Sequence, residues 1–205
     1  MWYYNPIFPL MKSLLFLFCL ATGVQFCTAQ TTPKKEFYSK EFNWSITIPE
    51  NFVPIDSAEM ARLESKGAAV MDKANNTKVE NHATLLFSVK TDQMNHFDCS
   101  YQPFNPAVDG DYLQTKQAIN NMLYKTLTTQ LQGVKVDTTM RIEKISNLEF
   151  NTFVTTVTYP NKMVLHSLMY YRLFGKREFS LNIVYREEEK GQQMLNAWKS
   201  SKFGK

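Results

Sequence analysis

The residues that decide the fold are 163–185, MVLHSLMYYRLFGKREFSLNIVY, which predict two strands and the turn between them. Residues 163–174 are apolar on both faces of an extended chain, as expected for a central strand that is covered on each side. Gly175-Lys176 then supplies a turn. In the second strand an apolar residue recurs at every other position, at Phe179, Leu181, Ile183 and Tyr185. This hairpin predicts an antiparallel sheet.

Two further strands precede the hairpin and have the same character. Residues 134–143 alternate between apolar and polar side chains, and a Ser-Asn turn at 146–147 leads into a second run at 148–158. A Pro-Asn turn at 160–161 then leads into the hairpin. Strands joined by such short turns are antiparallel neighbours. Residues 134–185 therefore predict a four-stranded antiparallel meander.

Two more strands are expected nearer the N-terminus. Residues 42–48 alternate between apolar and polar side chains as far as Pro49, which cannot donate to a strand ladder. A second run covers 83–90, and its apolar face is formed by Leu85, Phe87 and Val89.

Three helices are expected beside these strands. The first covers about 56–73 and the second about 111–131, with Gly133 as its C-terminal stop. The second helix should present one apolar stripe, formed by Leu113, Ile119, Met122, Leu123, Leu127 and Leu131. The closing helix, 188–201, should present Met194, Leu195 and Trp198. The predicted fold class is α+β: an antiparallel sheet of about six strands with helices packed on its faces.

This order of elements resembles the Mog1/PsbP-like group, in which an antiparallel sheet lies between helices. The similar segments are FNWSITIPENF at 42–52, FSLNIVY at 179–185, and the ending EEEK and MLNAWKSSKF at 187–190 and 194–203. The resemblance spans residues 37–203 and implies an α+β sandwich. Known members mostly bind or assemble other proteins, which implies a binding role here. No catalytic motif is shared, so the resemblance transfers no functional residue.

The N-terminal residues have the pattern of an export signal. Met11 and Lys12 supply a start and a positive charge, residues 14–26 are apolar, and small residues follow up to Ala29. This is the pattern of a Sec-type signal peptide that is cleaved after Ala29. The apolar run is shorter than the roughly 20 residues of a membrane span. We therefore expect a periplasmic or secreted protein with no stable membrane span after cleavage.

The expected organisation has three parts. Residues 1–29 are an upstream extension and the signal peptide, 30–36 are a flexible polar leader, and 37–205 form a single α+β domain. Attachment of a lipid to Cys27 is disfavoured, because the bulky Phe26 stands where bacterial lipoproteins place a small residue. An uncleaved signal that acts as an anchor remains an alternative.

Charge and motifs argue against several function classes. The formal net charge is +4, and the basic residues are scattered rather than gathered in a stripe that could neutralise several phosphates. Nucleic-acid binding is therefore not expected. The chain has no G-x-S-x-G, H-E-x-x-H, P-loop or G-x-G-x-x-G motif. These observations predict a non-enzymatic protein without a cofactor.

Residues 91–110 are expected to form a long, irregular loop. A connection of this length inside a compact domain is usually functional or disordered, and its aromatic residues argue against disorder. Phe97, Tyr101 and Phe104 are therefore the first candidate binding residues, for a protein partner in the cell envelope or outside the cell, or for a small ligand. The alternative is that these rings only fix the loop to the sheet.

A second hypothesis is a metal-handling or thiol-dependent protein centred on Met94, His96 and Cys99. Thioether, imidazole and thiolate donors suit copper(I) or zinc. On an extended chain, however, Met94, His96 and Asp98 share one face and Cys99 points away. As a nucleophile, Cys99 needs a base, which could be any of the three histidines, His82, His96 and His166. The alternative is a polar histidine beside a buried free thiol.

Overall fold

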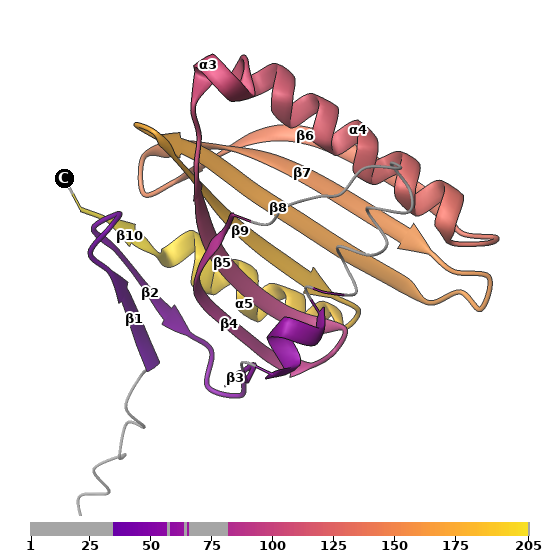
Figure 1. Ribbon diagram of the computed structural model, residues 1–205. Coiled ribbons are helices and arrows are strands. Elements are labelled where there is room, and N and C mark those ends of the chain that lie inside the picture. Colours follow the sequence, from indigo (N-terminus) through magenta and orange to yellow (C-terminus); the bar gives the residue numbers. More distant parts are fainter. Residues whose placement is uncertain (1–34, 57, 64, 66–81, 205) are drawn as a thin grey trace, which may run out of the picture. The chain divides into compact units, whose positions relative to one another are not determined.

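The computed structural model describes residues 35–56, 58–63, 65 and 82–204, and everything below concerns these residues (Figure 1). They form a seven-stranded sheet of order β3-β4-β5-β9-β8-β7-β6 and a three-stranded sheet of order β1-β2-β10. All paired strands are antiparallel. The elements are β1 (Lys35–Ser39), β2 (Trp44–Ile48), β3 (Val53–Pro54), β4 (Thr84–Asp92), β5 (Asn95–Pro103), α3 (Pro106–Asp109), α4 (Tyr112–Gln130), β6 (Lys135–Ile145), β7 (Leu148–Thr158), β8 (Val164–Phe174), β9 (Arg177–Tyr185), α5 (Glu188–Ser200) and β10 (Lys202–Phe203). Residues 58–63 are also helical.

The predicted α+β class and the C-terminal meander are confirmed. Strands β6, β7, β8 and β9 are consecutive neighbours in the sheet. The turn between β6 and β7 has a positive φ at both Ser146 and Asn147, which is typical of the two-residue turns that join hairpin strands. No helix within the described ranges is both long enough and apolar enough to span a membrane.

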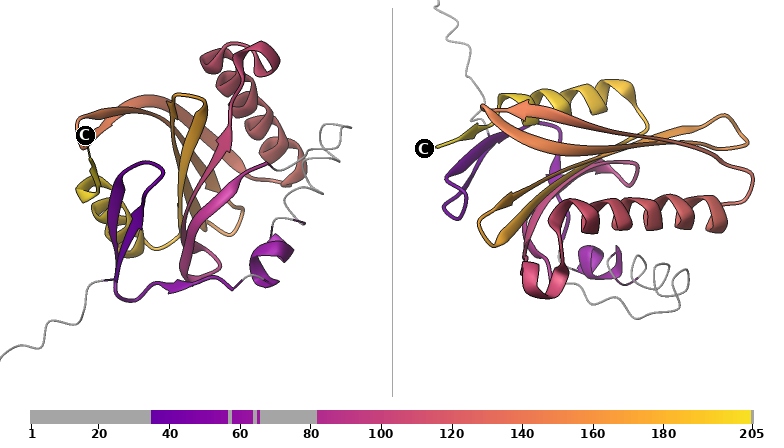
Figure 2. Two further views of the ribbon diagram at one scale, coloured as in Figure 1. Left: turned by 60° about the vertical axis from the view of Figure 1, so that its left-hand side comes forward. Right: turned by 90° about the horizontal axis from the view of Figure 1, so that it is seen from above.

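Helices α4 and α5 lie on opposite faces of the seven-stranded sheet, and residues 58–63 lie on the same face as α4 (Figure 2). We call these the α4 face and the α5 face. The α5 face carries the aromatic core, in which the centroids of Trp44 and Phe179, and of Phe150 and Trp198, are 5.0 Å apart. All four side chains are fully buried. The two ends of the domain meet here, because Trp44 belongs to β2 and Trp198 to α5.

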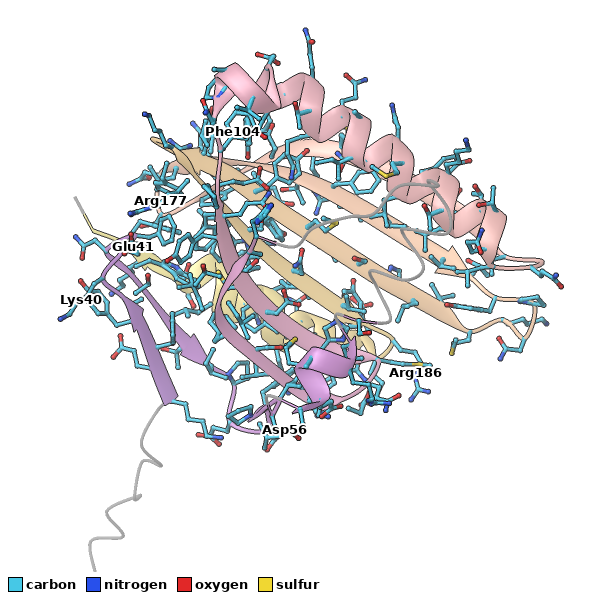
Figure 3. The ribbon with its side chains drawn as sticks, viewed as in Figure 1. Lys40, Glu41, Asp56, Phe104, Arg177 and Arg186 are labelled. Carbon is cyan, nitrogen blue, oxygen red and sulfur yellow. The ribbon has the colours of Figure 1, made fainter. Side chains whose placement is uncertain are left out.

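The small sheet closes one end of this core. The predicted alternation of apolar and polar side chains in β2 is confirmed, since the apolar residues Trp44, Ile46 and Ile48 are buried. Its neighbours were not predicted: β10 comes from the last residues of the chain, and β1 begins inside the predicted leader 30–36. An ion pair between Glu41 and Arg177 joins the turn after β1 to the start of β9 (Figure 3).

The predicted apolar stripe of α4 is only partly right. Most of its residues are half-buried: Ile119, Met122, Leu123, Leu127 and Leu131. Leu113, however, is 59% exposed, and the buried residues of this helix are polar: Lys116, Asn120 and Thr126. The reason lies in the sheet, whose α4 face is polar where the helix crosses it. Lys116 Nζ is 2.7 Å from Glu178 Oε1 in β9, and Asn120 Nδ2 donates to Tyr171 Oη in β8 at 3.2 Å. Polar pairs with the sheet therefore share the inward face of α4 with the apolar residues, which apolar spacing alone does not reveal.

The expectation of an irregular loop at 91–110 is also wrong. Residues Asn95–Pro103 form β5, which pairs with β4 on one side and β9 on the other. Only α3 and short connections remain of the predicted loop. Alternation in β5 sends Phe97 and Cys99 to the α5 face, and His96 and Asp98 to the α4 face.

Close packing at Gly191 leads to a prediction about stability. A Cβ atom at this position would lie 2.5 to 2.7 Å from three ring atoms of Tyr185, whose ring also stacks on His166 at a centroid distance of 4.8 Å. We expect Gly191→Ala to lower the free energy of unfolding by about 1–3 kcal/mol, measured by urea denaturation. Helix propensity alone predicts that the free energy of unfolding rises by about 1 kcal/mol. The sign of the measured change therefore distinguishes the steric effect from helix propensity.

The control for Gly191→Ala is Asn196→Ala, at an exposed position in the same helix. It introduces the same side chain without contact to Tyr185 and is expected to change stability by less than about 0.5 kcal/mol. A Gly191→Ala protein as stable as this control would contradict the prediction.

Candidate functional site

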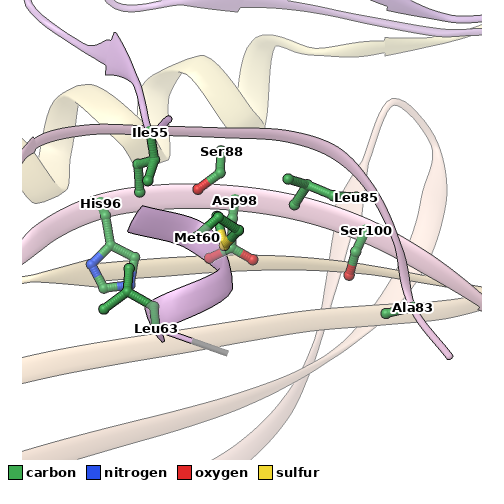
Figure 4. A pocket seen from close by; sticks show the side chains of 9 residues that line it. All are labelled: Ile55, Met60, Leu63, Ala83, Leu85, Ser88, His96, Asp98 and Ser100. Carbon is green, nitrogen blue, oxygen red and sulfur yellow. The ribbon is translucent and has the colours of Figure 1, made fainter. Parts of the chain in front are cut away.

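A cavity of about 370 Å³ lies on the α4 face, between the helical residues 58–63 and strands β4 and β5 (Figure 4). Its volume is at the lower end of the range typical of small-molecule sites. One side is aliphatic and the floor is polar. The lining residues are Ile55, Met60, Leu63, Ala83, Leu85, Ser88, His96, Asp98 and Ser100.

Local contacts hold the helical residues 58–63 over the strands. Asp56 caps them, because its Oδ1 accepts a hydrogen bond of 2.8 Å from the backbone N–H of Glu59. Glu59 forms an ion pair with Lys90 of β4. The backbone N–H of Ile55 donates to the carbonyl of Ser88 at 3.0 Å. The roof of the cavity is therefore attached to β4 at several points.

An irregularity in β4 supplies part of the aliphatic wall. Leu85, Phe87 and Val89 were expected on one face, and this is wrong for Leu85. The pairing of β4 with β5 shifts register between Leu85 and Phe87, which is the mark of a β-bulge. Phe87 and Val89 pair with the core residues Cys99 and Phe97, whereas Leu85 pairs with Ser100 and lines the cavity.

Asp98 is the acidic group at the polar floor. Burial raises the pKa of its carboxyl group above the ordinary value, because the carboxylate loses hydration there. Two weaker effects lower the pKa of Asp98: Asn182 Nδ2 donates a 2.8 Å hydrogen bond to Asp98 Oδ2, and His96 exerts a coulombic effect. A ligand group that donates a hydrogen bond or carries a positive charge would suit this carboxyl.

Ser88 stands beside Asp98, since the two residues are direct partners in the pairing of β4 with β5. Its hydroxyl is buried, and within the described part of the chain it has no hydrogen-bond partner. A buried polar group without a partner is costly, so its retention needs a reason. Because Ser88 lines the cavity, its hydroxyl is placed to bond a ligand.

His96 connects the cavity to a smaller neighbouring hollow of about 150 Å³. The two share Ile55, Leu63 and His96 as lining residues. The smaller hollow adds the charged residues Glu59, Lys90 and Asp92. An elongated ligand could therefore extend from the aliphatic wall past His96 toward a charged end.

A pH-dependent prediction follows from Asp98. Between the ordinary carboxyl pKa of 3.8 and its raised value, the folded protein holds a proton that the unfolded chain has lost. Stability therefore falls as the pH rises through this window, and the loss persists above it. Asp98→Asn carries no charge, so we expect it to be more stable than the wild type at pH 7. Urea titrations between about pH 4 and pH 8 should show the two proteins converging toward acid, and a more stable wild type at pH 7 contradicts the prediction.

The aromatic candidates lie elsewhere and do not form one patch. Phe97 is fully buried against Phe87, with ring centroids 5.1 Å apart. Tyr101 is half-buried against Phe42, and Phe104 is buried against Tyr112. Phe104 also lies at the opposite end of the sheet from Asp56, which caps the helical residues 58–63 beside the cavity (Figure 3). Phe97 and Phe104 thus serve packing, and the site described here uses neither.

Met94, His96 and Cys99 do not converge either. Met94 is in the β4–β5 turn, His96 lines the cavity, and Cys99 is fully buried on the α5 face. Burial raises the pKa of the Cys99 thiol well above its ordinary value, which disfavours the reactive thiolate. Within the described ranges no three His, Cys, Asp or Glu residues are grouped to bind a metal ion. The metal and thiol hypothesis therefore gains no support.

His166 is explained by its neighbours. Its Nδ1 is 3.2 Å from the hydroxyl oxygen of Thr156, and its ring stacks on Tyr185. His166 is therefore a hydrogen-bonded histidine on β8. It is too far from the core thiol of Cys99 to be its base, because β9 lies between their strands and their partners in β9, Tyr185 and Leu181, are not adjacent.

Sequence reasoning did not find this site. His96 and Asp98 were noticed only as possible metal ligands, and Ser88 and Asn182 were not noticed. A weak signal was present, because β9 places the polar residues Ser180 and Asn182 between buried apolar ones, next to β8, which was expected to be covered on both sides. A polar residue beside a covered strand needs a polar partner of its own.

Similarity to known proteins is found in the fold alone. No protein-family model matches this chain, and no curated protein matches it in sequence. The solution structure of cyanobacterial PsbP (CyanoP) from Synechocystis sp. PCC 6803 aligns with a TM-score of 0.54 and 9% identity, over 88% of this chain and 99% of that one. A crystal structure from Bacteroides thetaiotaomicron VPI-5482 aligns with a TM-score of 0.45 and 10% identity, over 85% of this chain and 50% of that one.

Proposed function

This chain has a PsbP-like fold, and from it we propose an exported, non-enzymatic domain that binds a small ligand in the cavity beneath residues 58–63. The observation that carries the proposal is the hydroxyl of Ser88 beside Asp98, on the floor of a cavity with an aliphatic wall; among the described residues this hydroxyl has no hydrogen-bond partner. A few converging polar groups in a mainly apolar cavity are typical of ligand sites.

The chemistry of the cavity indicates a class of ligand. An apolar body would contact Leu63, Leu85 and Met60, while a group that donates a hydrogen bond or carries a positive charge would face Asp98. Ser88 could donate to an acceptor next to that group. The ligand is therefore an amphipathic molecule with a donor or a cation at one end.

Binding suits this geometry better than catalysis. The only thiol in the described residues, Cys99, is on the opposite face of the sheet from His96. His96 makes no hydrogen bond with Ser88, Ser100 or Asp98 in the described structure, so no nucleophile is joined to a base. The proposed role is non-enzymatic for this reason.

Ligand binding is tested by filling the cavity. We would screen amphipathic amines and amides by ligand-observed NMR, and then compare the wild type with Leu63→Trp. The larger side chain should occupy the cavity and abolish binding of the hits. Leu113→Trp is the matched control, because Leu113 is exposed at a distant site on α4. Hits that bind Leu63→Trp as well as they bind the wild type would refute the cavity as the site.

Export is the second part of the proposal, and it rests on residues 11–29, which lie outside the described residues. In this proposal the protein acts in the periplasm or outside the cell, where a partner protein could also contact it. Expression in an exporting bacterium, followed by intact-mass measurement, tests the location. A mass that begins at Gln30 is expected. A lipid-sized addition at Cys27 would instead place the protein on a membrane, and an uncleaved N-terminus would contradict cleavage after Ala29.

A further inference from the structure

Strand β6 ends the seven-stranded sheet, and no described strand pairs with its outer edge. It is 11 residues long and exposed along most of its length; Met140 is 52% and Ile142 is 65% exposed. In Figure 1 it is the uppermost strand of the sheet. A long open edge presents unpaired backbone groups that can pair with another strand.

The charges of β6 are complementary to the same strand turned around. Lys135, Asp137, Arg141 and Glu143 occupy alternate positions on one face, with the neutral Thr139 at their centre. In an antiparallel pair related by a twofold axis at Thr139, Lys135 stands opposite Glu143 and Asp137 stands opposite Arg141. Every charged residue of this set then faces its opposite.

Neighbouring registers lack this match. Centring the pair on Thr138 places Lys135 opposite Arg141, and centring it on Met140 places Asp137 opposite Glu143. Both arrangements oppose like charges, which destabilises a strand pair. The same charges therefore discourage slipped pairing and favour one register.

We propose that β6 is a dimerisation strand, which pairs antiparallel with β6 of a second copy about a twofold axis at Thr139. The partner is this chain itself, because the charge pattern is self-complementary. On the other face of the strand, Ile142 stands opposite Val136 of the second copy and Met140 stands opposite Thr138, which covers two exposed apolar side chains. The two seven-stranded sheets become one continuous sheet.

Ion pairs within one copy are compatible with this arrangement. Lys135 Nζ is 2.8 Å from Asp137 Oδ2, and Arg141 Nε is 2.6 Å from Glu143 Oε1. Each pair lies along the strand, so dimerisation adds an opposite charge across the strand and removes none. The inference does not depend on the proposed ligand site, whose residues lie on β4, β5 and residues 55–63.

Charge exchange tests the proposal by sedimentation equilibrium from roughly 10 µM to 1 mM, the range suited to a small interface. Asp137→Arg sets the new arginine opposite Arg141 of the second copy, and Arg141→Asp creates the reverse conflict. Each single variant should weaken dimerisation about tenfold or more. The double variant Asp137→Arg/Arg141→Asp again places opposite charges at positions 137 and 141 of the two copies. It should recover most of the affinity of dimerisation. A wild type that is monomeric throughout, or singles that dimerise like the wild type, would overturn the proposal.

A crosslink tests the register directly. Residues opposite each other in an antiparallel pair have Cα atoms about 4.5–5.5 Å apart, within the range of a disulfide. Thr139→Cys should therefore form an intermolecular disulfide on mild oxidation, while the native Cys99 is buried. Ile142→Cys is the control, since the two Ile142 positions lie about 20 Å apart in this register. Equal crosslinking of both variants would indicate random collision and would refute the register.

Discussion

Phe179→Ala will lower the free energy of unfolding by about 3–5 kcal/mol, measured by urea denaturation. Phe179 lies in β9 with no exposed surface, at the centre of the aromatic core. Its ring is within 5.2 Å of the rings of Trp44 and Phe42, measured between centroids, and it also contacts Phe150 and Trp198. Alanine removes the ring and leaves a cavity that these large, interlocked side chains cannot fill.

Tyr124→Ala is the control for this change. It also removes an aromatic ring, but Tyr124 is 43% exposed on α4. We expect a loss of less than about 1 kcal/mol. A Phe179→Ala protein that loses no more than this control would show that the aromatic core is loosely packed.

Lys116→Ala should be comparably destabilising, by about 3–5 kcal/mol. Lys116 and Glu178 are 5% and 2% exposed, and their ion pair crosses from α4 to β9. Removing the lysine leaves the carboxylate of Glu178 buried without its cation, and it also removes the cation over the ring of Tyr171. Urea denaturation measures the loss.

Two comparisons isolate the buried charge as the cause. Lys144→Ala breaks an exposed ion pair with Glu149 and should cost no more than about 1 kcal/mol. The double variant Lys116→Met/Glu178→Leu removes both charges and should recover most of the stability lost in Lys116→Ala. If the double variant is less stable than the single one, the pair itself contributes to stability and the stated cause is wrong.

The parts of the fold that sequence could predict are those with an unbroken period. Strands β6 to β9 and helix α5 have regular apolar spacing and recognisable turns, and they appear where expected. The hairpin of β4 and β5 was missed although Asp92 and Asn95 flank its turn and Asp92 Oδ1 accepts a hydrogen bond of 2.8 Å from the backbone N–H of Met94. These polar residues were interpreted as part of a longer irregular segment. Alternation of Phe97, Cys99 and Tyr101 was visible, but it was interpreted as part of a loop.

The site could not be predicted for a different reason. Ser88, Asp98 and Asn182 become neighbours only through the registers of β4 with β5 and of β5 with β9. Asp98 and Asn182 are 84 residues apart in the chain. Leu85 lines the cavity only because a bulge reverses its direction, and no residue in β4 marks that bulge in advance.

The placement of β10 beside β2 has a consequence for how the protein reaches its folded state. Phe203 pairs with Trp44, although the two residues are far apart in the chain. Contacts between such distant residues close a long loop, and the entropic cost of that loop makes them slow to form. We therefore expect the small sheet to assemble late in folding, after the local hairpins of the seven-stranded sheet.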